Sequence, residues 1–181
     1  MKNVICICTI FVLVLLTGCQ SNRELKNNIE MKTVDYVDIE RFMGDWFVIA
    51  NIPTFIEKGA TNAIESYRLS KNGIIETTFT FHKDSPTGEK KVYKPKGFIY
   101  NKETNAEWRM QFLWPFKMPF LIIELAEDYS FTVIGYPSRK YVWIMAREPE
   151  MNPDTYKKIL SNLSTFGYDL DQIQLVPQSW D

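Results

Sequence analysis

From Gly44 onward, apolar and polar residues mostly alternate along the chain, which is the pattern of β-strands that bury one face. Turn-forming residues interrupt this alternation at short intervals, and Asn72-Gly73 and Glu127-Asp128 each predict a tight turn between two strands. The pattern predicts eight strands, near residues 44–52, 62–69, 74–82, 91–100, 106–113, 119–127, 130–136 and 141–147.

A single helix is predicted after the last strand. Asn152 is a good N-cap, Pro153 suits the first helical position, and Gly167 is a good stop signal. The apolar residues between them fall on one face: Tyr156, Ile159, Leu160 and Leu163. Consecutive short strands and one late helix predict a mainly β domain, an eight-stranded antiparallel up-and-down β-barrel with a C-terminal α-helix. A β-sandwich fits the same pattern.

The N-terminal residues follow a different pattern. Lys2 precedes 13 residues, Val4 to Leu16, that carry almost no polarity, and such a run suits the core of a signal peptide. It is too short to cross a bilayer core of roughly 30 Å as a helix, although an uncleaved anchor remains the alternative. Residues 20 to about 33 are polar and lack periodicity. We therefore expect a signal peptide over 1–18, a flexible tether over 19–33 and a folded domain over 34–181.

The apolar run ends in Leu16-Thr17-Gly18-Cys19, which resembles a bacterial lipobox. In a lipobox the cysteine sulfur receives a diacylglyceryl group, and cleavage leaves this cysteine as the first residue. The resemblance implies a lipid anchor on Cys19, with acyl chains such as palmitate that hold the protein at a membrane. Gln20 in the next position resembles the sorting pattern of Gram-negative outer-membrane lipoproteins. The expected location is the cell outer membrane, lipid-anchored, on the periplasmic side.

Composition narrows the chemistry that the domain can perform. The formal charge of -1, from 21 basic and 22 acidic residues that are interspersed, argues against a nucleic-acid partner. All three cysteines lie within the first 19 residues, so the domain has no disulfide, thiolate metal site or cysteine nucleophile. His82 is the only histidine, so a zinc site or a catalytic triad could be built only around it. Chemistry by carboxylates alone stays open.

Two segments resemble the motifs of a known family. Residues 42–47, Phe-Met-Gly-Asp-Trp-Phe, resemble the G-x-W signature of lipocalins, and residues 137–147 resemble their last barrel strand with its terminal arginine. Tyr67-x-Leu69 and Pro115-Phe116 lie in order between them. Over roughly residues 37–177 the chain is similar to bacterial outer-membrane lipocalins, with plant temperature-induced lipocalins and apolipoprotein D as wider relatives.

The resemblance implies a structural motif of Gly44, Trp46 and Arg147, in which the indole and the guanidinium plug one end of the barrel. Barrel geometry agrees, because strand one begins at the end where strand eight finishes. Trp46 and Arg147 should therefore meet, in a contact worth about 0.5–2 kcal/mol.

Strand alternation predicts the wall of a cavity above this plug. Since Arg147 faces inward, every second residue before it shares that face, which puts Trp143 at mid-cavity. Core packing without ligand contact is an equal interpretation for each wall residue, but together they would form an aromatic and aliphatic sleeve for an acyl chain. The expected ligand-binding residues are Val48, Ala50, Glu65, Tyr67, Leu69, Trp108, Met110, Phe112, Tyr141, Trp143 and Met145.

Glu65 is the one charged member of this set. A buried carboxylate is costly without a partner. It is therefore either a polar anchor for a lipid headgroup or a side chain near the open rim, in water or paired with a neighbour.

Four loops are expected at the open end: 53–61, 83–90, 114–119 and 137–140. The first and third are unusually apolar, with Phe55, Trp114 and Phe116 among them. Exposed apolar loops indicate contact with a partner or membrane. A lid folded across the barrel mouth would use the same residues.

Together these features predict a membrane-tethered carrier that binds a fatty acid or lysophospholipid without catalysis, metal or cofactor. Storage or transport of lipids in envelope maintenance is implied by the family resemblance alone, and a homodimer remains open. One alternative is a haem or tetrapyrrole binder, for which His82 is the only histidine ligand. Others are a lipid-modifying enzyme on the same fold and a structural lipoprotein that binds no ligand.

Overall fold

The computed structural model describes residues 30–180, and a compact unit begins at Met31. The expected signal peptide, the acylated Cys19 and most of the expected tether lie outside the described residues. The folded unit starts three residues before the expected boundary, because Met31 packs against an apolar cluster and the backbone N–H of Val34 donates to the carbonyl oxygen of Ile122. Among residues 30–180, no helix combines the length and apolarity needed to cross a membrane.

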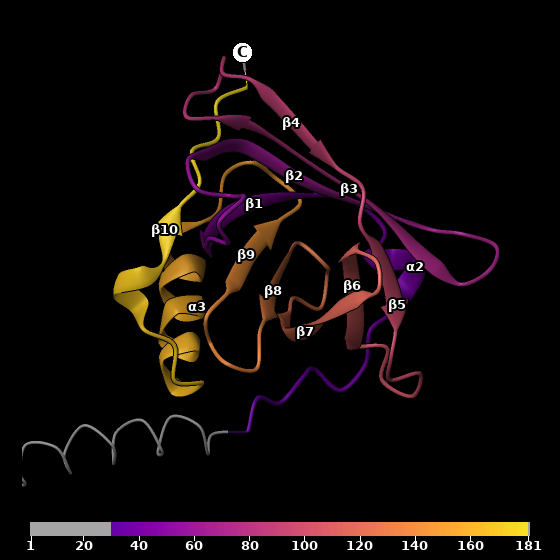
Figure 1. Cartoon of the computed structure of the whole chain (residues 1–181). Helices are drawn as coiled ribbons and strands as arrows, with labels where there is room; N and C mark the ends of the chain where they lie inside the picture. Colours follow the sequence, from indigo (N-terminus) through magenta and orange to yellow (C-terminus); the bar gives the residue numbers. More distant parts are fainter. Residues whose placement is uncertain (1–29, 181) are drawn as a thin grey trace, which may run out of the picture. The chain divides into compact units, whose positions relative to one another are not determined.

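The strands form a closed antiparallel barrel (Figure 1). Their order is β10-β1-β2-β3-β5-β6-β7-β8-β9, with β4 beside β3, and pairing of β9 with β1 closes the ring. The predicted eight-stranded antiparallel barrel with one main helix is confirmed. In chain order the elements are α2 (Ile39–Phe42), β1 (Gly44–Ile52), β2 (Ala60–Leu69), β3 (Ile74–Lys83), β4 (Lys90–Tyr93), β5 (Lys96–Ile99), β6 (Glu107–Leu113), β7 (Phe116–Leu125), β8 (Phe131–Gly135), β9 (Val142–Ala146), α3 (Pro153–Thr165), η1 (Leu170–Gln172) and β10 (Gln174–Leu175).

The fourth predicted strand is wrong as a continuous element. It divides into β4 and β5 around Lys94-Pro95, and the two pieces pair with opposite halves of β3. Pro95 has no backbone N–H to donate to a ladder, so it is found at strand breaks. The carbonyl oxygen of Pro95 still accepts a hydrogen bond from the backbone N–H of Thr77, at 3.2 Å. This bond holds the chain against β3 at the break.

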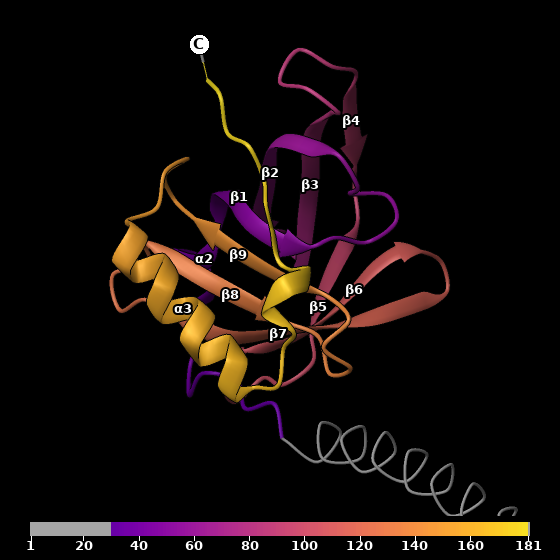
Figure 2. The same cartoon turned by 90° about the vertical axis from the view of Figure 1, so that its left-hand side faces the viewer.

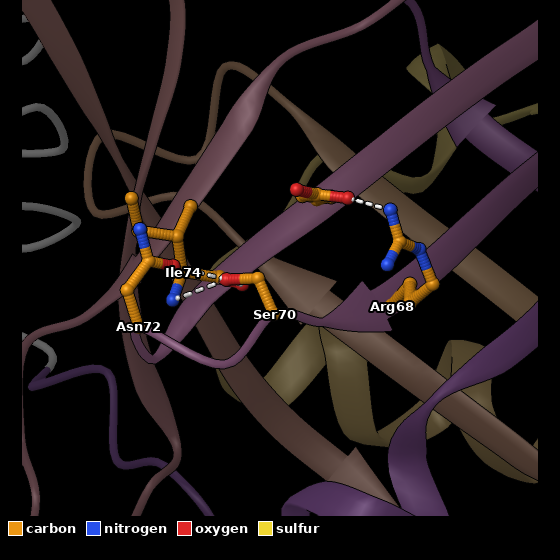
Figure 3. A network of polar contacts seen from close by, with 5 residues as sticks. Arg68, Ser70, Asn72 and Ile74 are labelled. Atoms are coloured by element: carbon orange, nitrogen blue, oxygen red, sulfur yellow. Dashed lines mark hydrogen bonds and ion pairs between the residues drawn. The ribbon is translucent and has the colours of Figure 1, made fainter.

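The turn between β2 and β3 forms where Asn72-Gly73 predicts it. The Ser70 hydroxyl bonds to the Asn72 side chain and to the carbonyl oxygen of Ile74, as Figure 3 shows. Gly73 has a φ of +78°, a conformation that glycine adopts without steric cost.

Helix α3 begins and ends as its sequence predicts. The Asn152 side chain accepts hydrogen bonds from the backbone N–H groups of Asp154 and Thr155, and Pro153 occupies the first turn. At the other end Gly167, with a φ of +81°, donates to the carbonyl of Ser164 while Tyr168 donates to that of Leu163. These two bonds make a Schellman cap.

The unit that starts at Met31 holds two apolar clusters. One fills the barrel interior, around Trp46, Phe79 and Trp108. The other lies between α3 and the outer face of the barrel, where Ile159 and Leu163 meet residues such as Ile144 of β9 (Figure 2). The chain from Met31 onward forms one compact unit, and among the described residues both clusters and the closed strand ladder lie within it.

The C-terminal segment adds a strand that the sequence did not indicate. Beyond Phe47, β1 no longer pairs with β2, and β10 pairs with it instead (Figure 1). The backbone N–H of Val176 donates to the carbonyl of Ile49 at 2.9 Å, and that of Asn62 donates to the carbonyl of Pro177 at 2.8 Å. The chain after η1 therefore fills the gap between β1 and β2 in the open half of the barrel.

Candidate ligand cavity

One end of the barrel is closed by the start of β1 and the residue that follows β9. The Arg147 guanidinium lies over the Trp46 ring and donates to the carbonyl oxygens of Arg41, Met43 and Asp45 at 2.7–2.9 Å. Gly44 has a φ of +95°, and a Cβ there would lie 3.3 Å from Nη1 of Arg147. Glycine therefore fits both the backbone conformation and the close approach of the guanidinium.

Directly above this plug, the barrel interior is filled by aromatic rings. Their centroids lie 5.0–6.1 Å apart, in stacked, tilted and edge-to-face arrangements typical of a packed aromatic core. Tyr67 and Trp108, expected to line the ligand sleeve, belong to this cluster and leave no room for a chain. The members of the cluster are Phe42, Trp46, Tyr67, Trp108 and Phe120.

The open half of the barrel contains a cavity of about 410 Å³. This volume falls within the range of small-molecule sites. Three of the predicted wall residues, Glu65, Phe112 and Trp143, line it. The other lining residues are Thr54, Phe55, Ile56, Glu57, Phe79, Tyr93, Lys94, Pro95, Leu113 and Met118.

Several predicted wall residues lie close to the cavity without lining it. Met110 borders a separate void of about 30 Å³, which shares Glu65, Phe112, Met118 and Trp143 with the main cavity. Val48 and Met145 face inward but are packed within the interior cluster. Tyr141 precedes β9 and packs its ring against Tyr136 and Trp143.

Two predicted wall residues are misplaced. Ala50 belongs to the cluster beneath α3, because the register of β1 against β9 shifts between Val48 and Ala50 and reverses which residues face inward. Leu69 lies at the closed end of β2, where its side chain is 37 % exposed beside the turn to β3. The alternation of residues along a strand predicts whether a side chain faces the barrel interior, but it does not predict how deep the cavity reaches.

Sequence reasoning missed Glu57 and Phe55, because both lie in the loop between β1 and β2, where no periodicity marks a direction. Phe79 could have been found, since it alternates inward with Phe81 along β3. Tyr93 stacks on both of these rings and completes the same wall.

The two acidic side chains of the cavity differ in their bonding. Oε1 of Glu57 accepts a hydrogen bond from Nε1–H of Trp143 at 2.6 Å, and its Oε2 accepts one from the backbone N–H of Thr54 at 2.8 Å. Glu65 is 8 % exposed, and its Oε2 has no hydrogen-bond partner among the described residues. Glu57 is thus an anchored acceptor, while Glu65 carries a buried oxygen that is free to bond.

Burial perturbs the ionisation of the inner polar groups. Desolvation raises the pKa of Glu65 well above its ordinary 4.5, and the nearby charge of Glu57 raises it further. The pKa of Tyr67 is raised by burial and then by Glu65 and Glu57. The Tyr67 hydroxyl and the Oγ1 of Thr77, which faces Tyr67 across the β2–β3 ladder, also lack partners within residues 30–180. Of these unsatisfied groups, Glu65 lines the interior cavity, whereas Tyr67 and Thr77 line a separate hollow on the barrel wall.

Comparison with known proteins agrees with this barrel fold. A family model described as a lipocalin-like domain matches residues 37–178. The chain belongs to the lipocalin family.

Relatives of this lipocalin occur in plants and in bacteria. It is 29% identical over 160 residues to temperature-induced lipocalin-1 of Arabidopsis thaliana, covering 83% of this chain and 84% of that protein. It is 25% identical over 166 residues to the outer membrane lipoprotein Blc of Vibrio cholerae, covering 91% and 94%. The structure of insecticyanin from the tobacco hornworm Manduca sexta superposes with a TM-score of 0.65 at 20% identity, covering 83% and 85%, which supports the fold.

The mouth of the lipocalin cavity is surrounded by exposed apolar side chains. Phe55 is 84 % exposed in the loop between β1 and β2, and Trp114 is 81 % exposed between β6 and β7. Leu113 and Phe116 beside Trp114 are also exposed. The side chains at these loop tips project into solvent, so they do not form a lid across the barrel mouth, which was the alternative to a contact surface.

A second hollow of about 460 Å³ lies on the barrel wall where β4 and β5 separate. Arg68, Glu76, Lys94 and Lys96 are among its lining residues, and Arg68 and Glu76 form an ion pair with each other. Its charged, exposed lining is unsuited to an apolar ligand. The interior cavity is therefore the candidate ligand site of this lipocalin.

Proposed function

We propose that this lipocalin is a membrane-anchored carrier that binds single-chain lipids, fatty acids or lysophospholipids, without covalent attachment. The observation that carries the proposal is the 410 Å³ cavity with walls of Phe79, Phe112, Met118 and Trp143. An acyl chain in such a sleeve gains roughly 25 cal/mol for each Å² of apolar surface that it buries. Storage or movement of lipids within a bacterial envelope is the role that we propose for this binding, on the strength of the family resemblance.

The anchor is proposed to be an acylated Cys19. The support is the Leu16-Thr17-Gly18-Cys19 sequence, together with relatives named outer membrane lipoproteins in Vibrio cholerae and Escherichia coli. Gln20 favours the outer membrane, and we place the barrel on its periplasmic side.

The exposed loops provide a route between bilayer and cavity. Phe55 and Leu113 both line the cavity and are exposed. Trp114 and Phe116 extend the same apolar surface, and tryptophan favours the interface between lipid and water. We propose that these tips enter the headgroup region, so that a lipid leaves the membrane without crossing water.

Two other functions have less support. A histidine ligand to haem would have to be His82, but this residue alternates with the inward Phe81 along β3 and is absent from the cavity lining. An enzyme could draw on the lining residues able to transfer a proton, Glu57, Glu65, Tyr93 and Lys94, but the relatives of this chain are named a lipocalin and an outer membrane lipoprotein, not an enzyme. We therefore propose a binding protein rather than a catalyst.

The test is mass spectrometry of lipids that co-purify with the 20–181 fragment under non-denaturing conditions. Met118→Glu, which puts a charge on the cavity wall, should remove bound lipid. Val92→Glu, at a half-exposed position on β4 outside the cavity lining, should keep it. Equal lipid in both variants, or none in the wild type, would count against the carrier.

A further inference from the structure

The mostly apolar cavity has an acidic inner wall that pairs with no cation among residues 30–180. Within residues 30–180, Glu57 and Glu65 take part in none of the ion pairs. The nearest lining cation, Lys94, is exposed to solvent. Deep in the barrel, the free Oε2 of Glu65 and the Tyr67 hydroxyl both lack hydrogen-bond partners. Buried polar atoms are rarely left in this state unless something else bonds to them.

We propose that the cavity selects a hydrophobic amine, an alkyl chain with an ammonium head, which binds with its head inward at Glu65 and Glu57. Its chain then runs outward along Phe79 and Met118 to the apolar mouth. This inference rests on the proposed function and names the headgroup that the site prefers.

An ammonium group matches the acceptors at this wall. It carries three donors and no acceptor, whereas an ionised carboxylate only accepts. One donor can reach the free Oε2 of Glu65, while Glu57 adds a second negative charge beside it. Charge attraction is much stronger there than in water, because the site is desolvated. An alcohol head could form the hydrogen bonds but not the ion pair.

A carboxylate head meets the opposite situation. Placed inward, it would lie near the negative charge of Glu57, and like charges in a desolvated site repel strongly even while Glu65 keeps its proton. It would be favoured only at the rim, where Lys94 is exposed. Tyr93, the other titratable residue of the lining, cannot offset the acids because it carries no positive charge.

Binding of the amine should release a proton. In the empty cavity, burial and the charge of Glu57 raise the pKa of Glu65, so its carboxyl keeps its proton to a higher pH than an exposed glutamate does. An ammonium head favours the carboxylate, so the Glu65 proton passes to solvent and an ammonium–carboxylate pair remains. Each bound amine therefore releases up to one proton, whereas a neutral alcohol releases none.

The experiment compares dodecylamine, dodecan-1-ol and dodecanoate, which share a chain length, on the 20–181 fragment at pH 7. Calorimetry in two buffers of different ionisation enthalpy gives the affinity and the number of protons released. We expect dodecylamine to bind at least about tenfold tighter than dodecanoate, with proton release. Glu65→Gln should lower dodecylamine affinity by about tenfold and abolish the release, while dodecan-1-ol binding persists. The exposed Glu76→Gln should match the wild type.

The wild-type comparison decides the inference even if Glu65→Gln fails to fold. Dodecanoate binding as tightly as dodecylamine would overturn it, and so would an unchanged preference in folded Glu65→Gln. If dodecan-1-ol and dodecanoate bind but the amine has no advantage, the lipid carrier survives and the headgroup assignment falls. If none of the three probes binds, nor a lysophospholipid, both proposals fall together.

Discussion

The guanidinium carbon of Arg147 lies 3.7 Å from the centroid of the Trp46 ring. Its nitrogens also donate to the carbonyl oxygens of Arg41, Phe42, Met43 and Asp45. One side chain thus joins the end of β9 to the start of β1 and to the C-terminal end of α2, across the seam where the barrel closes.

Arg147→Ala should therefore destabilise the barrel by about 2–4 kcal/mol, since it removes a cation–π contact and several charged hydrogen bonds. Urea unfolding of the 20–181 fragment measures the loss. Arg68→Ala is the matched control, because Arg68 pairs with Glu76 at an exposed site, and it should cost less than about 1 kcal/mol. Ligand binding should survive in Arg147→Ala, since the aromatic cluster separates the plug from the cavity. If the urea midpoint of Arg147→Ala equals that of Arg68→Ala, the contact between Arg147 and Trp46 adds nothing to stability.

Asn62 should be the residue that holds the C-terminal segment in place. Its Nδ2 donates to the Ser179 carbonyl and its Oδ1 accepts from the Ser179 backbone N–H, both at 2.7 Å. Its φ of +49° is also tolerated better by asparagine than by alanine. We expect Asn62→Ala to cost about 2–3 kcal/mol and to make residues 174–181 susceptible to proteases.

The control for this prediction is Ser179→Ala, which keeps both bonds because they use the Ser179 backbone. Its unfolding midpoint should stay near that of the wild type. Equal effects of the two substitutions would show that the side chain of Asn62 does not secure the segment.

The sequence predicted best where one strand keeps its alternation from end to end. Along β9, Trp143 and Met145 face inward as expected, and Arg147 follows at the closed end. Along β1 the five consecutive residues 48–52 are buried, and the first three of them are all apolar. The alternation therefore does not mark the register shift after Val48 and predicts the wrong face for Ala50. A run that is apolar on both faces carries no period from which a bulge could be located.

The alternation of apolar and polar residues predicts neither the depth of the cavity nor the burial of Glu57 within it, for different reasons. Whether Tyr67 and Trp108 line a cavity or pack against each other depends on Phe42, which the short helix α2 brings into the barrel. Glu57 lies in a loop, and its burial depends on the hydrogen bond from Trp143, a residue distant in sequence. Such contacts exist only once the barrel has closed.

The stability of the domain should carry a pH signature of Glu65. Because the pKa of Glu65 is raised above 4.5 in the folded protein, its stabilising contribution is complete below that pH and is lost as the pH rises toward the folded value. Glu65→Gln cannot ionise and escapes this loss. The variant should therefore gain stability relative to the wild type as the pH rises from about 5 to about 8.

Urea unfolding at both pH values measures this difference. Glu76→Gln, at an exposed carboxylate, is the control and should show a nearly constant offset from the wild type. If the curves of Glu65→Gln and wild type run parallel from pH 5 to pH 8, Glu65 is not held protonated.

Cys19→Ser should abolish membrane attachment and leave the barrel folded, because the compact unit that holds both described apolar clusters begins at Met31. Fractionation of cells that produce the full chain measures attachment, and circular dichroism of the released protein measures folding. A variant that stays with the membrane fraction would show that the apolar N-terminal run or the loops around Trp114 suffice for attachment.

Trp143 should report the ligand directly, because its indole lines the cavity and donates to Glu57. Addition of oleate or a lysophospholipid to the 20–181 fragment should change its fluorescence, and Trp143→Phe should remove most of that change. Trp46 and Trp108 are fully buried within the aromatic cluster and should contribute little. The confounding residue is Trp114, which is exposed at the mouth and would respond to lipid aggregates.

Trp114→Phe separates the two signals. It should keep the response to monomeric ligand and lose the response to vesicles, whereas Trp143→Phe should do the reverse. Binding itself should survive Trp143→Phe, since an apolar sleeve spreads its contribution over many contacts. A full response in Trp143→Phe with monomeric lipid would place the ligand outside the cavity. No response in any variant, with no heat of binding, would leave a structural lipoprotein as the better description, because a barrel with an accessible apolar cavity of this size should take up such a chain.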